Sequence, residues 1–256
     1  KNKLTIGRRG LGRTLCLLGS LFVLPLFPAQ AAVDVSGSIT ANTAWTTAQS
    51  PYTVTGDISV DNGASLTIEP GVTVYMNAGI NLTVNAGSLM ARGTAAAPIV
   101  ITSANDITTG TPAAGDWGQV RIQDGASDAG TLLEYVDIRY GHGIAIQSAS
   151  PTLNYLNIKN SAGPAISQDL LSSPVGVGNQ ASGNTINGVL VPAGDILGNV
   201  IWGLKGIPYV VAQGLISIGQ SPVISGINPI QIQQGETLTA TISGTRLSTA
   251  EQIVFD

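Results

Sequence analysis

The chain carries few residues suited to catalysis, and its single histidine is the first of them. His142 lies between Gly141 and Gly143, and the nearest carboxylate before it is Asp137. Imidazoles and carboxylates are common proton-transfer catalysts. Hydrolysis of a glycosidic bond, in contrast, needs two carboxylates placed across that bond. Asp137 alone cannot fill both roles, so we predict that His142 occupies a turn and that the chain is not an enzyme. His142 and Asp137 are the catalytic candidates of the alternative hypothesis.

The acidic residues of one turn are candidates for binding a cation. Asp124 and Asp128 enclose Gly125-Ala126-Ser127 and form the densest acidic turn of the chain. Calcium takes six to eight oxygen ligands, and an EF-hand loop closes with a glutamate that is missing here. We therefore predict a solvated turn, and we expect no cofactor and no metal.

Six residues are candidates for a binding surface because two segments repeat at a spacing of twenty. They are Tyr135, Asp137, Arg139, Tyr155, Asn157 and Lys159. In a strand with Val136 and Ile138 turned inward, the first three point outward because side chains alternate between faces. Tyrosine rings beside polar groups suit a sugar, which stacks by its face and forms hydrogen bonds by its edge. The alternative is a plain outer wall of stacked like residues.

The spacing of these candidates comes from an internal repeat. Residues 133–146 (LEYVDIRYGHGIAI) recur as residues 153–166 (LNYLNIKNSAGPAI), and a second match at a spacing of sixteen relates Thr67 to Thr83. Repeats of about twenty residues, each a short β-branched run closed by glycine or asparagine, are typical of solenoids. We therefore predict a β-solenoid. A row of threonines such as Thr67 and Thr83 is either an ice-matching face or a result of β-propensity.

The solenoid is expected to occupy residues 51–219, with residues 32–50 as a leader that caps its first coil. A cap is expected because the end coil of a solenoid exposes open sheet edges. At about twenty residues per coil, residues 51–200 form about seven or eight coils. The expected strands are 53–60, 65–68, 72–76, 81–84, 99–102, 119–123, 132–138, 143–147 and 153–158.

One aromatic pair occurs twice. Trp45 and Tyr52 are echoed by Trp202 and Tyr209 at the same spacing, each tyrosine directly preceded by a proline. The second pair is expected either to open another β-helix unit or to cap the edge of the last coil in the same way as the first pair caps the edge of the first coil.

The first 31 residues have the pattern of a secretory signal peptide. Five basic residues precede an apolar run over 15–24, and Ala31 and Ala32 flank the expected cleavage site. The run is too short for a good membrane span, so we expect export to the cell surface or the medium, without membrane insertion afterwards. Five of the 11 basic residues lie in this segment, which leaves six against 15 acidic residues. This balance argues against a nucleic-acid partner, because phosphates attract Lys and Arg.

Residues 220–256 differ in composition from the solenoid. Alternating runs at 237–242 and 252–255 between Pro and Gly residues predict strands of a sandwich. The stretch resembles the start of an IPT/TIG immunoglobulin-like domain in its Ser221-Pro222 opening, Asn228-Pro229, and the segments 235–238, 243–247 and 254–256. The resemblance covers about the first half of such a domain, so the domain is expected to be incomplete and the chain to be part of a longer protein.

The solenoid part resembles the right-handed parallel β-helix segments of large bacterial surface and secreted proteins. The matching residues are 66–74 (LTIEPGVTV), Gly93-Thr94 with Pro98-Ile99, Asp116-Trp117-Gly118 and 133–138 (LEYVDI). The resemblance covers about residues 50–200 and implies an all-β, right-handed parallel β-helix.

Two enzyme families with this fold offer comparisons. Gly141-His142-Gly143 is similar to the Gly-His-Gly of polygalacturonases, but the accompanying Asp pair, Asn-x-Asp and Arg-x-Lys motifs are missing. Pectate lyases hold calcium on converging acidic side chains, and the turn at Asp124 and Asp128 offers too few.

We therefore expect a non-enzymatic, exported segment that serves as a rigid spacer or as a display or adhesion platform of a larger bacterial protein. Its partners would be a glycan or another surface protein. The alternative is a carbohydrate-active β-helix protein, either a polygalacturonase-like or pectate-lyase-like enzyme or a glycan-binding module.

Overall fold

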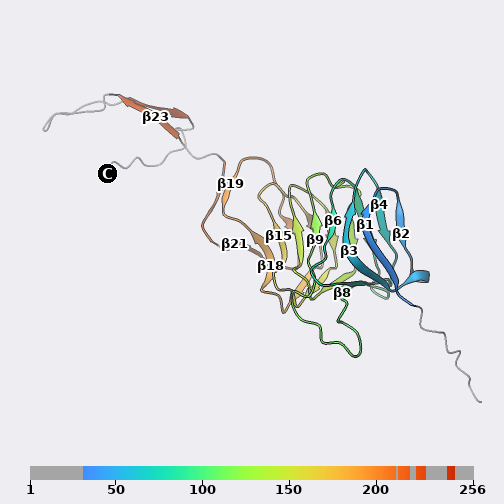
Figure 1. The fold of residues 1–256 in the computed structure, drawn as a ribbon. Coiled ribbons are helices and arrows are strands. Elements are labelled where there is room, and N and C mark those ends of the chain that lie inside the picture. The colour runs from blue at the N-terminus through green and yellow to red at the C-terminus, as the bar shows by residue number, and fades with distance from the viewer. Residues whose placement is uncertain (1–30, 212, 220–222, 229–240, 246–256) are drawn as a thin grey trace, which may run out of the picture.

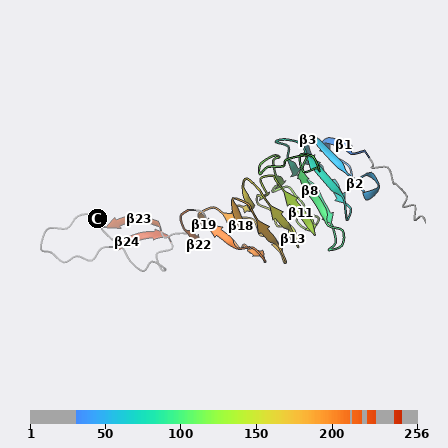
Figure 2. The same ribbon diagram turned by 90° about the horizontal axis from the view of Figure 1, so that it is seen from below.

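A computed structural model describes residues 31–211, 213–219, 223–228 and 241–245. Short strands follow one another through these residues, and the only helix among them is the 3₁₀ turn η1 (Thr47–Gln49). The strands stack in parallel into a right-handed β-helix of about eight coils, which confirms the predicted solenoid. Figure 1 and Figure 2 show the coils side by side, from β1 (Val33–Ile39) at one end to β21 (Tyr209–Val211) at the other. None of the described residues forms a helix long and apolar enough to cross a membrane.

Each inner coil has three faces, and parallel pairing runs along each face from coil to coil. The first face contains β5 (Thr73–Met76), β8 (Ile99–Ser103), β11 (Val136–Arg139), β14 (Asn157–Lys159) and β17 (Gln180–Ser182). The second contains β6 (Leu82–Val84), β9 (Val120–Ile122), β12 (Ile144–Ile146), β15 (Pro164–Gln168), β18 (Ile186–Val191) and β21. The third contains β2 (Thr43–Trp45), β4 (Ser65–Ile68), β7 (Ser88–Arg92), β10 (Leu132–Glu134), β13 (Thr152–Asn154), β16 (Val175–Gly176) and β20 (Gly203–Leu204).

The long strand β3 (Tyr52–Val60) belongs to two faces. Its residues 52–54 pair with β5 and its residues 58–60 pair with β6. The first two faces are therefore joined through β3 into one continuous sheet. A short extra pair, β19 (Gly194–Ile196) with β22 (Ile216–Ile218), stands beside the last coils.

The core forms because side chains alternate between the inside and the outside of each strand. In register, Val74, Ile101, Ile138 and Ile158 stack along the first face, and all four are completely buried. Burying one such side chain contributes about 1.5–3 kcal/mol. Because each coil supplies inward residues to this stack, the core extends with the number of coils.

The repeat of twenty is a true coil repeat, but the repeat of sixteen is not. Ile138 pairs in register with Ile158, as predicted. Thr67 of β4, in contrast, stacks on Met90 of the third face, whereas Thr83 of β6 stacks on Arg121 of the second. The match at sixteen relates two faces of the solenoid, so the expected row of Thr67 and Thr83 is wrong.

The expected leader contributes a coil of its own. β1 pairs with β3 and β2 pairs with β4, both in parallel, so these strands stack on the coil that the leader was expected to cap. Ala31 and Ala32 are exposed directly before β1. Residues 1–30 of the predicted signal peptide lie outside the described residues.

The paired aromatic residues form the same contact twice. The rings of Trp45 and Tyr52 stack with centroids 5.2 Å apart, and those of Trp202 and Tyr209 do the same at 5.2 Å. The first pair is buried, with exposures of 3% and 2%, whereas the second pair is only partly buried. Beyond it, β23 (Val223–Asn228) pairs with β24 (Thr241–Thr245) in antiparallel fashion. The rest of the predicted strands 237–242 and 252–255 lies outside the described residues.

Candidate functional site

Residues 104–119 leave the coil between β8 and β9 and return beside His142; Figure 1 shows this excursion as the green loop below the rod. Asp116 closes the base of the loop. Its Oδ2 accepts hydrogen bonds from Ser103 Oγ (2.6 Å), Asn105 Nδ2 (3.2 Å) and the Ala113 amide (3.1 Å). Burial alone would raise the pKa of Asp116, but these hydrogen bonds outweigh it and lower the pKa below its usual value. An ionised carboxylate therefore holds the loop together.

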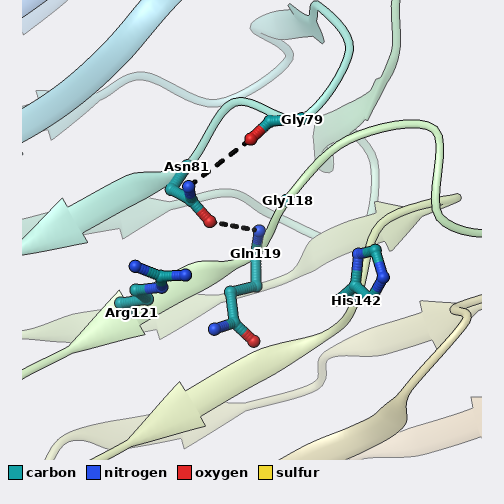
Figure 3. Close-up of a pocket in the computed structure, with 6 residues that line it drawn as sticks. All are labelled: Gly79, Asn81, Gly118, Gln119, Arg121 and His142. Carbon is teal, nitrogen blue, oxygen red and sulfur yellow. Dashed lines mark hydrogen bonds between the residues drawn. The ribbon is translucent and has the colours of Figure 1, made fainter.

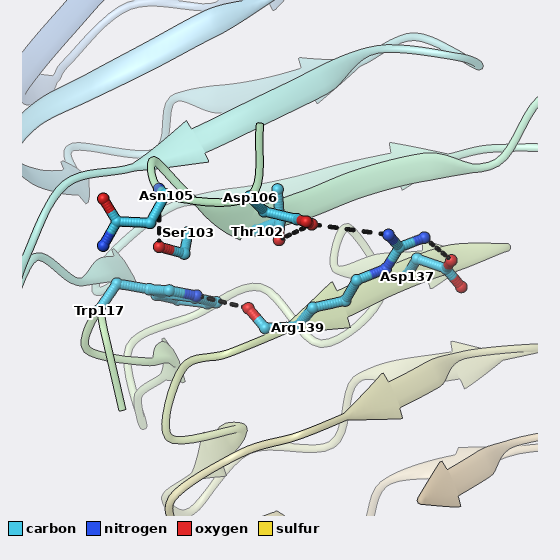
Figure 4. A network of polar contacts seen from close by, with 7 residues as sticks. All are labelled: Thr102, Ser103, Asn105, Asp106, Trp117, Asp137 and Arg139. Atoms are coloured by element: carbon cyan, nitrogen blue, oxygen red, sulfur yellow. Dashed lines mark hydrogen bonds and ion pairs between the residues drawn. The ribbon is translucent and has the colours of Figure 1, made fainter. Parts of the chain in front are cut away.

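Arg139 fastens this loop to the next coil, as Figure 4 shows. Its Nη2 donates to Asp137 Oδ2 at 2.6 Å, and its Nη1 lies 3.6 Å from Asp106 Oδ2 in the loop. The indole Nε1 of Trp117 donates to the carbonyl oxygen of Arg139 at 2.7 Å. Burial alone would lower the pKa of Arg139, but the hydrogen bond and charge of Asp137, with the charge of Asp106, raise it. Asp137 is thus the partner of a cation on the outer wall.

His142 makes the third contact that holds the loop. We call the contacts of Asp116, Arg139 and His142 with the loop, together with the partners Asp106 and Asp137 of Arg139, the clasp. Its side chain is exposed, and its Nδ1 lies 2.9 Å from the carbonyl oxygen of Trp117. Because a carbonyl oxygen only accepts, Nδ1 carries the hydrogen and Nε2 is left for other contacts. Position 141 has no room for a side chain, because an added Cβ would lie 2.5 Å from the Trp117 indole. Among the described residues, no hydrogen bond or ion pair joins Asp137 to His142.

A shallow hollow of about 290 Å³ opens beside His142 on the second face. Its lining residues, drawn in Figure 3, are Gly79, Asn81, Gly118, Gln119, Arg121 and His142. Asn81 builds its floor: Oδ1 accepts from the Gln119 amide at 3.1 Å and Nδ2 donates to the Gly79 carbonyl at 3.5 Å. The side chains of Gln119, Arg121 and His142 therefore remain as the polar groups that a ligand would meet.

The two tyrosines of the predicted surface lie together, but not on a strand. Tyr135 and Tyr155 have φ values of 49° and 51° and occupy the corners that follow β10 and β13. The predicted strands 132–138 and 153–158 are each broken there, so the expected strand position of Tyr135 is wrong. The two rings stack at 4.6 Å with an interplanar angle of 7°. On its other side Tyr155 packs against Gly178, whose added Cβ would collide with the ring.

The remaining residues of that surface are placed as the repeat predicted. Asp137 pairs in register with Asn157, and Arg139 with Lys159, on the outer side of the first face. The Tyr155 ring stacks on Tyr135 and packs against Gly178, yet 43% of Tyr155 stays exposed, so part of this side chain is open to solvent. Glycan binding by these six residues stays a prediction.

The acidic turn is used structurally. Asp128 Oδ1 accepts a hydrogen bond from the Ser150 amide of the next coil at 2.6 Å, and Asp124 is exposed. Within the described ranges, His, Cys, Asp and Glu side chains form no group of three or more that could hold a metal ion.

A family model described as a pectate-lyase-like β-helix domain matches residues 37–191, which is more than half of the chain. The chain belongs to this family. The match begins within β1 and ends with β18, so it covers the coils, the clasp and the hollow. The pectate-lyase-like β-helix family includes enzymes, and membership by itself does not decide whether this member is one. Neither the curated proteins nor the solved structures contain a significant match to the chain.

Sequence reasoning missed two features of this pectate-lyase-like β-helix. The ion pair of Asp106 with Arg139 joins residues far apart in sequence, without any periodic signal. Arg121 gives no periodic signal, because it follows a coil insertion that shifts it out of the repeat: Thr83 and Arg121 stack although 38 positions separate them.

Proposed function

We propose that the chain is a non-enzymatic, exported β-helix segment that acts as a rigid spacer or as a display or adhesion platform in a larger bacterial surface or secreted protein. The observation that carries this proposal is the continuous core. Completely buried aliphatic side chains occur on all three faces, from Val54 near the first coil to Val191 near the last. Such stacking gives a rod whose two ends are held at a fixed separation.

The surroundings of the catalytic candidates support the same proposal. Asp137 is paired with Arg139, and His142 is bonded through Nδ1 to the loop. Acid–base cleavage of a glycosidic bond needs two carboxyl groups facing each other across the substrate. Asp106 and Asp137 instead bind Arg139, and Asp116 binds Ser103 at the base of the loop.

Export and a downstream domain are further parts of the proposal. The exposed Ala31 and Ala32 directly before β1 fit a cleavage site that leaves the first strand intact. The antiparallel pair of β23 and β24 fits the start of an IPT/TIG domain, because immunoglobulin-like sandwiches are built from antiparallel strands. A glycan or another surface protein is the proposed partner.

A second candidate function is carbohydrate binding or cleavage. The family includes enzymes, and the hollow beside His142 presents the polar side chains that orient saccharides. Under this alternative His142 and Asp137 act in catalysis, or the residues around Tyr135 and Tyr155 bind without cleavage.

One experiment separates these functions. The purified chain is incubated with a panel of neutral and acidic polysaccharides, and new reducing ends, unsaturated products and retention on immobilised glycan are measured. We expect no turnover. Turnover that is lost in His142→Ala, while Arg92→Gln keeps it, would overturn the non-enzymatic proposal. Retention that is lost in Tyr135→Ala and Tyr155→Ala would identify a glycan-binding module. Melting temperatures of all variants establish that the fold is kept.

A further inference from the structure

Arg121 is the only charged residue among those that line the hollow as Figure 3 draws it. In the described part of the chain, ion pairs engage Arg92 with Glu134 and Arg139 with Asp106 and Asp137, but none engages Arg121. The chain has more acidic than basic residues, 15 against 11. The positive charge of Arg121 is therefore not balanced by an ion pair within the described residues.

The neighbours of Arg121 leave it without a counter-charge. In register along the second face, the residues on either side of it are Thr83 and Ala145, which carry no charge. Nε of Arg121 is buried and has no hydrogen-bond partner among the described residues. Because arginine stays protonated and its planar fork matches an oxyanion, the guanidinium beside the hollow suits an acceptor with negative charge.

The groups around Arg121 suit such a partner. The Gln119 side chain, whose backbone amide is fixed by Asn81, offers amide hydrogens next to the guanidinium. His142, oriented by its bond to the Trp117 carbonyl, adds Nε2 at the opposite side. Two successive coils thus place the Arg121 cation, the Gln119 side-chain amide and the His142 imidazole around a space open to solvent.

We propose that the hollow formed by Gln119, Arg121 and His142 binds an oxyanion group, such as a carboxylate, sulfate or phosphate, of a larger ligand. Arg121 supplies the charge and a forked pair of donors, and Gln119 supplies an additional donor. The site shares His142 with the clasp, but its cation, Arg121, pairs with neither Asp106 nor Asp137, and the site does not require the chain to be an enzyme.

The test uses the whole chain labelled with ¹⁵N and titrated separately with sodium acetate, sulfate and phosphate at constant ionic strength. We expect saturable chemical-shift changes of the Gln119 side-chain amide and the Arg121 Nε–H. The order of affinity among the three salts identifies the preferred oxyanion. Arg121→Gln should weaken binding by about tenfold or more, because a charged hydrogen bond is lost. Arg121→Lys should weaken it less, because the charge remains while the fork is lost.

Arg92→Gln is the matched control. It removes the same charge from a third-face residue that is paired with Glu134, so general effects of net charge appear in it equally. Binding that stays at the wild-type level in Arg92→Gln and falls in Arg121→Gln supports the site. Shifts that do not saturate, or that are equal in Arg121→Gln and the wild type, overturn it. An unchanged melting temperature of Arg121→Gln establishes that a loss reflects the site and not the fold.

Discussion

At the scale of single residues, the contact between Gly141 and Trp117 decides how the long loop is held. Trp117 is completely buried, and its indole fills the space that a side chain at position 141 would occupy. The sequence offers Gly141 only as a turn residue, whereas the structure makes it a packing residue. The loop, the imidazole of His142 and the corner of the next coil therefore depend on one missing methyl group.

Gly141→Ala should lower the free energy of unfolding by about 1–3 kcal/mol, because an added methyl group overpacks a filled site. Urea unfolding measures this change, and limited proteolysis within residues 104–119 should become faster. Gly198→Ala is the control, since an added Cβ there meets nothing within 4 Å. Equal stability of the two variants would show that the indole moves away without cost.

Asp169 makes stability depend on pH. Burial alone would raise its pKa, but hydrogen bonds from Ser172, Leu171 and Ser148 outweigh this and lower the pKa below the ordinary 3.8. A lowered pKa in the folded state adds stability that is complete above the ordinary value and is lost as the pH falls through the folded value.

We therefore expect the urea midpoint to fall between about pH 5 and pH 2, and to fall less steeply in Asp169→Asn. Asp124→Asn removes the same charge from an exposed turn and serves as the control. An identical pH profile for the wild type and Asp169→Asn would contradict the assigned role of this carboxylate.

At the scale of the elements, the corners between faces carry specific contacts. Tyr135 and Tyr155 adopt a left-handed conformation that non-glycine residues seldom take. Their rings stack from one coil to the next. The corner is thus stabilised from outside the core by aromatic contact.

A double-mutant cycle with Tyr135→Ala and Tyr155→Ala should give a coupling energy of about 0.5–1.5 kcal/mol, as expected for a stacked pair. Chemical denaturation of the wild type, both single variants and the double variant measures it. Additive effects of the two substitutions would mean that the stack contributes nothing beyond the separate burial of each ring.

Most strands from β3 to β14 were predictable from sequence, whereas β1, β2, β7 and the strands from β15 to β22 were not among the predicted ones. The strand Ser65–Ile68 was predicted with the bounds that it has, because its alternation ends at turn residues on both sides. In residues 133–138 the buried Leu133 and Val136 are three positions apart, so the alternation slips by one residue at Tyr135, and this slip is the only trace of the corner in the pattern. Backbone strain at a tyrosine has no marker in the sequence, unlike a turn built on glycine.

The candidate site was only partly predictable for a related reason. The neighbours Asp137 and Asn157 follow from the repeat of twenty and lie as expected. The contacts of Asp106 and Arg121 depend on the loop at 104–119, which interrupts the repeat. A single sequence also cannot distinguish similarity between coils from similarity between faces, as the match of Thr67 with Thr83 shows.

At the scale of the whole molecule, each coil is stabilised by the coils on its two sides. A solenoid of this kind has stability made of coil terms and neighbour terms, and its end coils have one neighbour fewer. Here the end pair Trp202–Tyr209 is less buried than the equivalent pair Trp45–Tyr52. Tyr52 lies between two paired strands, β1 and β5, whereas Tyr209 pairs only with β18.

Amide hydrogen exchange should therefore be slowest in the middle strands β8 and β11 and fastest in β20 and β21 at the exposed end. Mass spectrometry of peptic fragments after exchange for increasing times measures this gradient. Uniform protection from β4 to β21 would mean that the rod unfolds as one cooperative unit.

The direction of the backbone hydrogen bonds has a mechanical consequence. They join each coil to the next, as in the pairing of Ile138 with Ile158, and therefore run along the rod axis. A force that pulls the two ends apart loads these bonds a few at a time, beginning at the end coil. The rod should thus unfold one coil after another, and each coil of about twenty residues should release about 70 Å of chain. A protein that resists bending would then lengthen in steps under tension and protect whatever it connects from a sudden load.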